Sequence, residues 1–191
     1  KSGLPENIYS EEGVEYYEAK VKYQYNTDFN PRADIVKDNP NNSYERNYGN
    51  NDVKGPDPLH GTHVGGIIGA IRNNNLGNDG IAPNVKLMPV RAVPDGDERD
   101  KDVANAIRYA VDNGASIINM SFGKGFSPDK NIVDEAVRYA AKKDVLIIHA
   151  AGNDGGNNDN NPNYPNDTFE KKSGFLCKKN KKATNWISVG A

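Results

Sequence analysis

Two histidines, His60 and His63, are spaced so that they could bind a metal ion or act in acid–base catalysis. His60 and His63 lie three residues apart at the start of an expected helix, in the sequence HGTHVGG. At this spacing both side chains share a helix face and could bind a metal ion. No acidic residue follows one turn later, and His149 lies in an apolar stretch, so a third ligand is missing and we predict no metal site. The alternative is acid–base chemistry, with one of the two histidines as a general base at the helix start and the other as a structural contact.

A second candidate follows the apolar stretch 145–151. Gly152 and Asn153 place a side-chain amide donor beside open backbone, an arrangement that can hold a developing oxyanion. The alternative is an ordinary turn in an Asn-Asp-Gly-Gly sequence. Ser121 ends another apolar stretch, but no Gly-x-Ser-x-Gly motif surrounds it. We therefore interpret Ser121, Phe122 and Gly123 as the lining of a groove rather than as a nucleophile site.

Apolar periodicity predicts the elements that carry these residues. Helices are expected from His60 onward and over residues 11–22, 103–111 and 133–141, and strands over residues 85–93, 116–120, 145–151 and 186–189. Residues 26–58 are predicted to be loop, and the glycines at 65, 66 and 69 are expected to allow close packing of their helix. Strands alternating with helices indicate a parallel sheet, whose ligands gather beyond the carboxyl ends of the strands.

Composition excludes several classes of protein. The chain has 191 residues and a formal charge of −2, without the basic excess of a dedicated nucleic-acid binder. No apolar run is long enough to span a membrane. The single cysteine, Cys177, excludes an internal disulfide framework and a multi-cysteine zinc site, and we interpret it as a loop thiol. The length suits one domain with a sizeable core.

Taken together, in this order and spacing, residues 60–67, 117–123 and 150–154 resemble the motifs of the subtilisin-like serine proteases, or subtilases. The resemblance is dense over residues 57–155, weak over 183–191 and absent over 1–56. It implies an α/β fold of three layers, with a mostly parallel sheet, helices on both faces and truncation at both ends. Residues 1–56 would be a loop-rich N-terminal segment of the same domain, and residues 57–191 the central part of the catalytic domain.

The resemblance also implies roles for individual residues. His60 would be the general base of the triad, and Asn153 would donate its amide to the oxyanion. Two sets of residues would bind substrate. Ser121, Phe122, Gly123, Ala151 and Gly152 would line the pocket for the residue before the scissile bond, and the edge strand Asp95, Gly96, Asp97 and Glu98 would pair with an extended peptide. Because this edge is acidic, we expect its subsites to favour basic or polar side chains.

Two family motifs are missing. The triad acid should stand in Asp-Ser-Gly or Asp-Thr-Gly, and neither tripeptide occurs. Asp34 and Asp38 are the nearest acids, but neither follows an apolar run. The nucleophile motif Gly-Thr-Ser-x-Ala-x-Pro is also absent. We therefore expect an incomplete serine endopeptidase domain that is inactive by itself. The alternatives are a non-catalytic protease-like module that binds peptides, and a metal-binding or small-ligand α/β domain.

The remaining expectations concern ions, partners and location. No cofactor is expected to be required, although the loop 72–80 offers oxygens that suit a structural calcium ion, with Asp79 as its one acid; a plain Asn-rich turn is the alternative. The expected partner is a polypeptide substrate, and open sheet edges could support self-association. The family resemblance implies secretion or a place in a bacterial cell envelope, although the chain carries no signal peptide.

Overall fold

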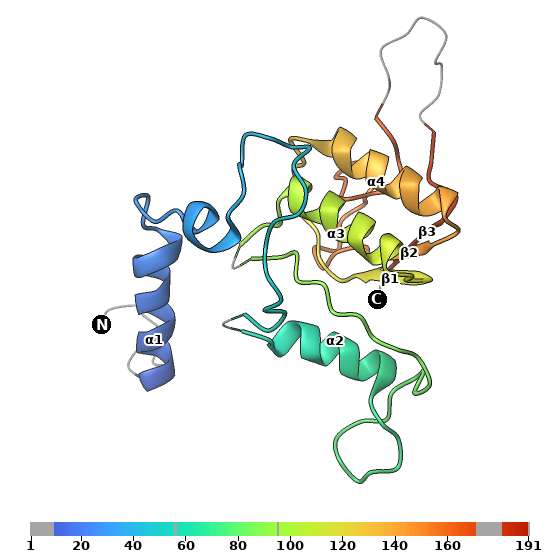
Figure 1. Ribbon diagram of the computed structural model, residues 1–191. Helices are drawn as coiled ribbons and strands as arrows, with labels where there is room; N and C mark the ends of the chain where they lie inside the picture. The colour runs from blue at the N-terminus through green and yellow to red at the C-terminus, as the bar shows by residue number, and fades with distance from the viewer. Residues whose placement is uncertain (1–9, 56, 95, 171–180, 191) are drawn as a thin grey trace, which may run out of the picture. The chain divides into compact units, whose positions relative to one another are not determined.

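A computed structural model describes residues 10–55, 57–94, 96–170 and 181–190 (Figure 1). Asp95 and Cys177 lie outside these ranges. The chain forms two compact units, Lys1–Asn50 and Asn51–Ala191, and each is described by itself. The division that we expected at residue 56 stays a prediction. No helix within the described ranges is long and apolar enough to cross a membrane.

The first unit contains short helices. Helix α1 (Glu11–Ala19) begins where the Ser10 hydroxyl accepts a hydrogen bond from the Gly13 amide at 3.0 Å, and it continues into a π-helix, η2 (Lys20–Gln24). The predicted helix over 11–22 is thereby confirmed. A second π-helix, η3 (Arg32–Val36), interrupts the stretch 26–58 that we expected to be loop. That expectation is wrong over these five residues, which lie inside a turn closed by an ion pair between Arg32 and Asp38.

Among its described residues, the second unit forms three α-helices and three strands. Helices α2 (Leu59–Gly69), α3 (Asp100–Asp112) and α4 (Lys130–Lys142) match the three predicted from apolar spacing. Acidic side chains in the first turn of α3 and Lys142 in the last turn of α4 complement the helix dipoles. Gly114 follows α3 with a φ of +84°, a conformation that a glycine adopts without steric cost.

The strands form a parallel sheet in the order β1-β2-β3. Strands β1 (Ile117–Met120), β2 (Leu146–Ala150) and β3 (Trp186–Val189) confirm three of the four predicted strands. The register sets Met120 opposite His149, and Ile147 opposite Trp186. The fold is therefore α/β with a parallel sheet, as expected. The edges of this sheet are β1 and β3, and association through them stays a prediction.

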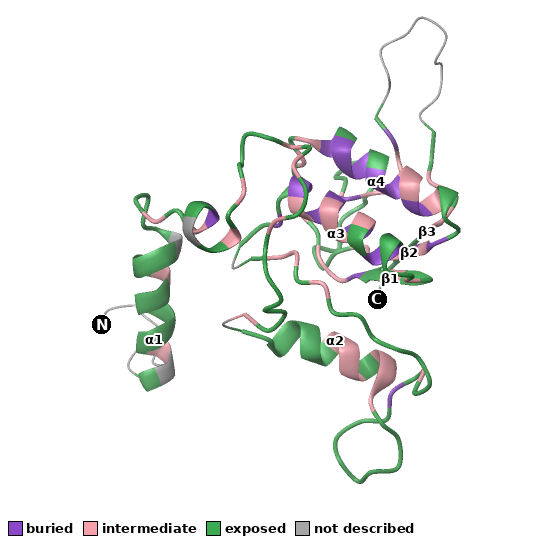
Figure 2. Ribbon diagram, in the orientation of Figure 1, coloured by how far each residue is buried: buried purple, intermediate pink, exposed green. Residues whose placement is uncertain are grey.

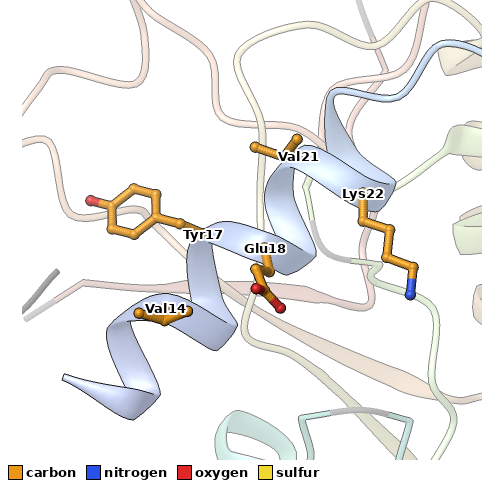
Figure 3. A pocket seen from close by; sticks show the side chains of 5 residues that line it. All are labelled: Val14, Tyr17, Glu18, Val21 and Lys22. Atoms are coloured by element: carbon orange, nitrogen blue, oxygen red, sulfur yellow. The ribbon is translucent and has the colours of Figure 1, made fainter. Parts of the chain in front are cut away.

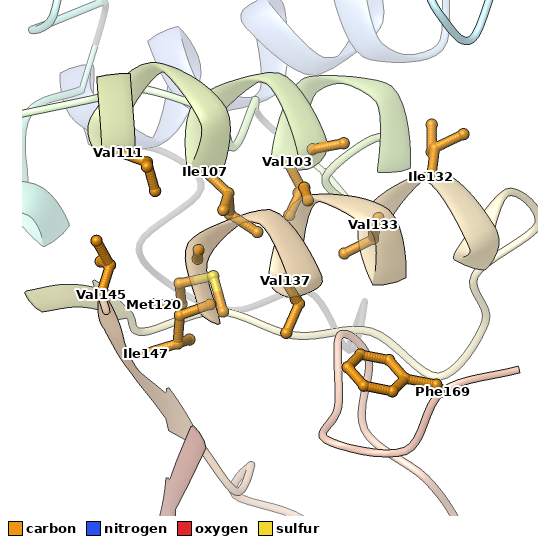
Figure 4. Close-up of a cluster of buried hydrophobic side chains, with 13 residues drawn as sticks. Val103, Ile107, Val111, Met120, Ile132, Val133, Val137, Val145, Ile147 and Phe169 are labelled. Carbon is orange, nitrogen blue, oxygen red and sulfur yellow. The ribbon is translucent and has the colours of Figure 1, made fainter. Parts of the chain in front are cut away.

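One face of the sheet lies against α3 and α4, where the hydrophobic core forms (Figures 1 and 4). The core combines apolar residues from both helices with inward-facing strand residues, among them Ile107, Val137, Met120 and Ile147. On the other face, Ile117, Ile187 and Val189 are about half exposed. A helical layer on that second face stays a prediction.

The strand expected over residues 85–93 is wrong. These residues belong to no helix or strand and pair with no strand among the described residues. A strand needs a hydrogen-bonded neighbour, and apolar alternation alone does not supply one. The side chains of Val85 and Leu87 instead lie beside Gly69 of α2. The close approach that demands a glycine is nearby at Gly80, where a Cβ atom would stand 2.3 Å from the Ala70 nitrogen.

Candidate functional site

The carboxyl ends of β1 and β2 bring together the segments 121–123 and 150–153. Because Met120 and His149 face each other in the parallel register, the residues that follow them leave the sheet side by side. A third segment joins them: the main chains of Lys124 and Tyr164 form an isolated antiparallel bridge. The residues predicted to line the pocket therefore lie in converging loops: Ser121, Phe122, Gly123, Ala151 and Gly152.

The side chain of Asn163 fills the space between these loops. Its Nδ2 atom donates a hydrogen bond to the carbonyl oxygen of Ala150 at 3.1 Å. A Cβ atom on Gly123 would lie 2.3 Å from the Asn163 amide oxygen, and one on Gly152 would lie 3.5 Å from its nitrogen. Glycine at position 123 therefore lets Asn163 approach the backbone closely. Asn163 could not be predicted from the sequence, because nothing local distinguishes it from the other asparagines of its loop.

Asn153 has a different environment. It directly follows Gly152, whose φ of +97° turns the chain away from β2. Its side chain is exposed and makes no hydrogen bond to any residue that the structure describes. Asn158 instead donates to the Ala151 carbonyl oxygen at 2.8 Å and holds the neighbouring backbone. The amide of Asn153 is thus available to donate to a ligand at the end of β2.

His149 packs between two aromatic rings, edge-to-face with Phe122 and tilted against Trp186. The ring centroid of His149 is 6.3 Å from that of Phe122 and 5.3 Å from that of Trp186. The imidazole is buried, and its Nε2 atom has no hydrogen-bond partner within the described chain. Burial lowers the pKa of His149 to about 4, opposed in part by a hydrogen bond to the main chain of Phe122. His149 is a neutral packing residue at neutral pH.

His60 lies in the first turn of α2, where Asp57 accepts a hydrogen bond from the Leu59 amide at 2.9 Å. Both His60 and His63 are exposed. Among the described residues no hydrogen bond links His60 to Asn153, and their meeting at one site stays a prediction. No group of three His, Cys, Asp or Glu side chains that could hold a metal occurs in the part of the chain described.

The two acids considered for the triad lie in the first unit. The carboxylate of Asp38 is fully buried against Arg32, whose Nε donates to it at 2.7 Å. An Asp held by arginine in this way is occupied with a structural ion pair. The side chain of Asp34 lies outside what the structure describes.

The expected substrate-binding edge is a loop where it is described. Gly96 has a φ of +124°, Asp97 is exposed and Glu98 is buried, and none of the three belongs to a strand. Burial raises the pKa of the Glu98 carboxyl. Of the two acids described at this edge, Asp97 is therefore the one that could meet a substrate.

Oxygens of the loop 72–80 and the residue after it already have a cationic partner. The guanidinium of Arg72 donates to the carbonyl oxygens of Gly80 and Ile81 at 2.7 and 2.9 Å. The carboxylate of Asp79 accepts a hydrogen bond from the Asn73 amide. A fixed positive charge beside these oxygens does not fit a calcium ion bound through them.

The first unit carries a shallow hollow of its own along α1 and η2. Figure 3 shows its lining, which combines apolar side chains with one acid and one base: Val14, Tyr17, Glu18, Val21 and Lys22. This set contains no serine, cysteine or histidine, and none of its residues belongs to the segments 121–123 and 150–153.

Comparisons with known proteins agree on one family. Residues 10–191 match the description "Subtilase family". The chain is 43% identical over 97 residues to a thermophilic serine proteinase of Bacillus sp. (strain AK1), covering 50% of this chain and 24% of the relative. It is 39% identical over 107 residues to thermitase of Thermoactinomyces vulgaris, covering 56% of this chain and 37% of the relative.

A solved structure gives a consistent result. The S41 psychrophilic protease superposes with a TM-score of 0.50 and 36% identity, over 60% of this chain and 38% of that one. The chain spans about a quarter of the length of the first proteinase and somewhat over a third of thermitase. The match to the family extends over nearly all of the sequence. The chain therefore belongs to the subtilase family.

Proposed function

We propose that this chain is part of a serine-type endopeptidase that hydrolyses extended polypeptides through an acyl-enzyme. The observation that carries the proposal is the exposed, unpartnered amide of Asn153 beside the converging loops 121–123 and 150–152. In this reaction a serine oxygen attacks the scissile carbonyl carbon and the carbonyl oxygen becomes negatively charged. Asn153 donates its Nδ2–H to that oxygen, which stabilises the transition state more than the substrate.

His60 is proposed as the general base. It takes the proton of the attacking serine and returns it to the nitrogen of the leaving amine, so that the peptide bond breaks and an acyl-enzyme remains. This role requires α2 to bring His60 to the carboxyl ends of β1 and β2. The hydroxyl of Ser121 accepts a hydrogen bond from Asn119 at 2.9 Å and is not proposed as the nucleophile. We expect the 191 residues alone to be inactive.

The decisive experiment removes the amide of Asn153 in the longest natural reading frame that contains this chain. Asn153→Ala should lower kcat on the order of 100- to 1,000-fold with little change in KM, a magnitude first established for subtilisin, which is a member of the same family. The matched control is Asn160→Ala, which changes another exposed asparagine of the same loop. Equal effects of the two substitutions would contradict the role of Asn153.

We also propose that the groove edge prefers basic or polar residues before the scissile bond, through Asp97. The exposed carboxylate of Asp97 attracts a cationic side chain weakly, since solvent screens the pair. Asp97→Asn should reduce the preference for a lysine-containing peptide over its neutral counterpart by up to about fivefold. Asp144→Asn, an exposed acid after α4, is the control. An unchanged preference would remove Asp97 from the specificity of the enzyme.

Secretion or a place in the cell envelope is proposed by analogy with relatives. Two similar proteins of Bacillus subtilis (strain 168) are named as a minor extracellular protease and a cell wall-associated protease. Fractionation of the source cells with an antibody to this chain tests the proposal, since a wholly cytoplasmic signal would contradict it. A non-catalytic peptide-binding module remains the second function class. It would be favoured if the complete protein bound peptides and cleaved none.

A further inference from the structure

A buried lysine joins the segments that flank the candidate groove. Lys124 directly follows Gly123, and its amide and carbonyl groups pair with those of Tyr164 at 3.0 and 2.8 Å. Its Nζ atom donates to the carbonyl oxygen of Glu98 at 2.6 Å and lies 2.9 Å from the Oδ1 atom of Asp100. One residue therefore connects the loop 96–98, the segment 121–123 and the loop that carries Asn163.

Lys124 and Asp100 form a buried ion pair, and the charged groups of both have further hydrogen-bond partners. The side chains of Lys124 and Asp100 are 7% and 5% exposed. Asp100 also accepts hydrogen bonds from the Ser127 hydroxyl at 2.9 Å and from the Asp129 amide at 2.7 Å. It stands at the first residue of α3, where the helix dipole favours a negative charge. Because a buried ion pair is stable only with good geometry and further hydrogen bonds, the cluster holds its members in one arrangement.

This arrangement matters because neither flanking segment belongs to the sheet. The loop 96–98 and the segment 121–123 have no strand ladder of their own to fix their separation. A peptide that pairs with extended backbone requires its neighbour at about 4.8 Å, so small changes in separation break the main-chain hydrogen bonds. The contact from the Lys124 ammonium to the Glu98 carbonyl acts on the backbone of the loop itself.

We propose that Lys124 is a positioning residue that holds the loop 96–98 in register with the segment 121–123, so that the two bind an extended peptide. The inference rests on the proposed endopeptidase function. Lys124 touches no reacting atom in this account. It lowers the cost of ordering the loop when the peptide binds, and its effect therefore grows with the number of peptide residues before the scissile bond.

The test compares two substrates in the full-length enzyme. One is a peptide with four residues before the scissile bond, and the other is an ester of a single acylated amino acid. Lys124→Met removes the ammonium and keeps much of the side-chain volume. It should lower kcat/KM for the peptide about tenfold more than for the ester. A purely structural role would lower both values by the same factor, because it changes only the amount of folded enzyme.

A second buried lysine provides the matched control. Lys130 pairs with Asp134 and donates to the Thr168 carbonyl oxygen at 2.6 Å, and its side chain is 10% exposed. Lys130→Met therefore removes a comparable buried charge from a site that involves neither groove segment. It should leave the ratio of peptide to ester activity unchanged. If Lys124→Met does not fold, Asp100→Asn weakens the same cluster from the other side and should change the ratio in the same direction.

The outcomes test the positioning role of Lys124 separately from the proposed endopeptidase function. A selective loss of peptide activity in Lys124→Met or Asp100→Asn, and not in Lys130→Met, supports the positioning role. An unchanged ratio in an active enzyme, or an equal change in the control, overturns it while leaving the endopeptidase function intact. A parent enzyme that cleaves neither substrate refutes the proposed function, and the positioning role with it.

Discussion

Helices α2 and α3 show two different outcomes of equally clear sequence patterns. Both were expected from apolar residues at helical spacing, and both form. Helix α3 buries its apolar face, including Val103 and Ile107, in the core that it shares with α4. Helix α2 has no buried residue, and Ile71 just beyond it is 73% exposed (Figure 2). The apolar periodicity thus predicts that a helix forms. Whether its apolar face becomes buried depends on a packing partner, which the periodicity does not identify.

The largest expected difference between these regions is in their contribution to stability. Ile107 of α3 is 1% exposed, so Ile107→Ala should destabilise the chain by about 2–5 kcal/mol through lost burial and a new cavity. Ile71→Ala, an equal truncation at the exposed site, should cost at most about 0.5 kcal/mol. Urea unfolding followed by fluorescence of Trp186, the single tryptophan, measures both. A large effect of Ile71→Ala would mean that α2 has a packed partner.

A smaller effect concerns pH and the core region. The pKa of His149 is about 4 in the folded chain against 6.5 for an unperturbed histidine. Unfolding therefore takes up a proton between these values. Stability should be complete above about pH 6.5 and should fall by a total of ~3 kcal/mol as pH decreases through the folded pKa. Urea midpoints between pH 7 and pH 4 measure this decrease.

The control for the pH effect is His149→Phe, which keeps an aromatic ring between Phe122 and Trp186 and cannot titrate. The free energy of unfolding of His149→Phe should decrease less than that of the parent over the same pH range. Parallel pH profiles for the parent and His149→Phe would show that other groups cause the acid sensitivity.

The smallest expected effect lies in the loop after α2. Because Arg72 already supplies a positive charge to the carbonyl oxygens of Gly80 and Ile81, we propose that no calcium ion is needed there. The melting temperature should change by less than about 1 °C between millimolar calcium and a chelator. Arg72→Gln should lower the melting temperature in both conditions. A clear rise with calcium would contradict the proposal and make the loop an ion site.

Much of the second unit was predictable because its signals are local. The strands over 117–120, 146–150 and 186–189 are apolar and β-branched, and the helices between them repeat at 3.6 residues. The stretch 85–93 carried a similar apolar signal and formed no strand, since pairing requires a neighbour elsewhere in the chain. The π-helix at Arg32–Val36 was missed because polar, Asn-rich sequence around it signals only turns.

The candidate site divides in the same way. Gly152 and Asn153 were identifiable from the sequence because they directly follow an apolar strand, and because an asparagine at that place can donate its side-chain amide to an oxyanion. Asn163 and Lys124 were not identifiable from the sequence, because each acts through contacts with distant residues. Lys124 contacts Asp100 and Glu98, which are 24 and 26 positions earlier, and Tyr164, which is 40 positions later, and Asn163 contacts Ala150, which is 13 positions earlier. Contacts at such distances depend on how the loops meet above the sheet, and no local pattern encodes them.

By itself, the sequence determined the family, the parallel α/β pattern and the residue types available for catalysis, because each depends on short motifs or on periodicity along one element. Only the tertiary structure decided which of these residues meet. It set the loops 121–123 and 150–153 side by side through the register of β1 and β2. It also inserted Asn163 between them and buried Lys124 against Asp100. These contacts depend on packing and on charge pairing between segments that are distant in sequence. Such segments come together only when the chain folds.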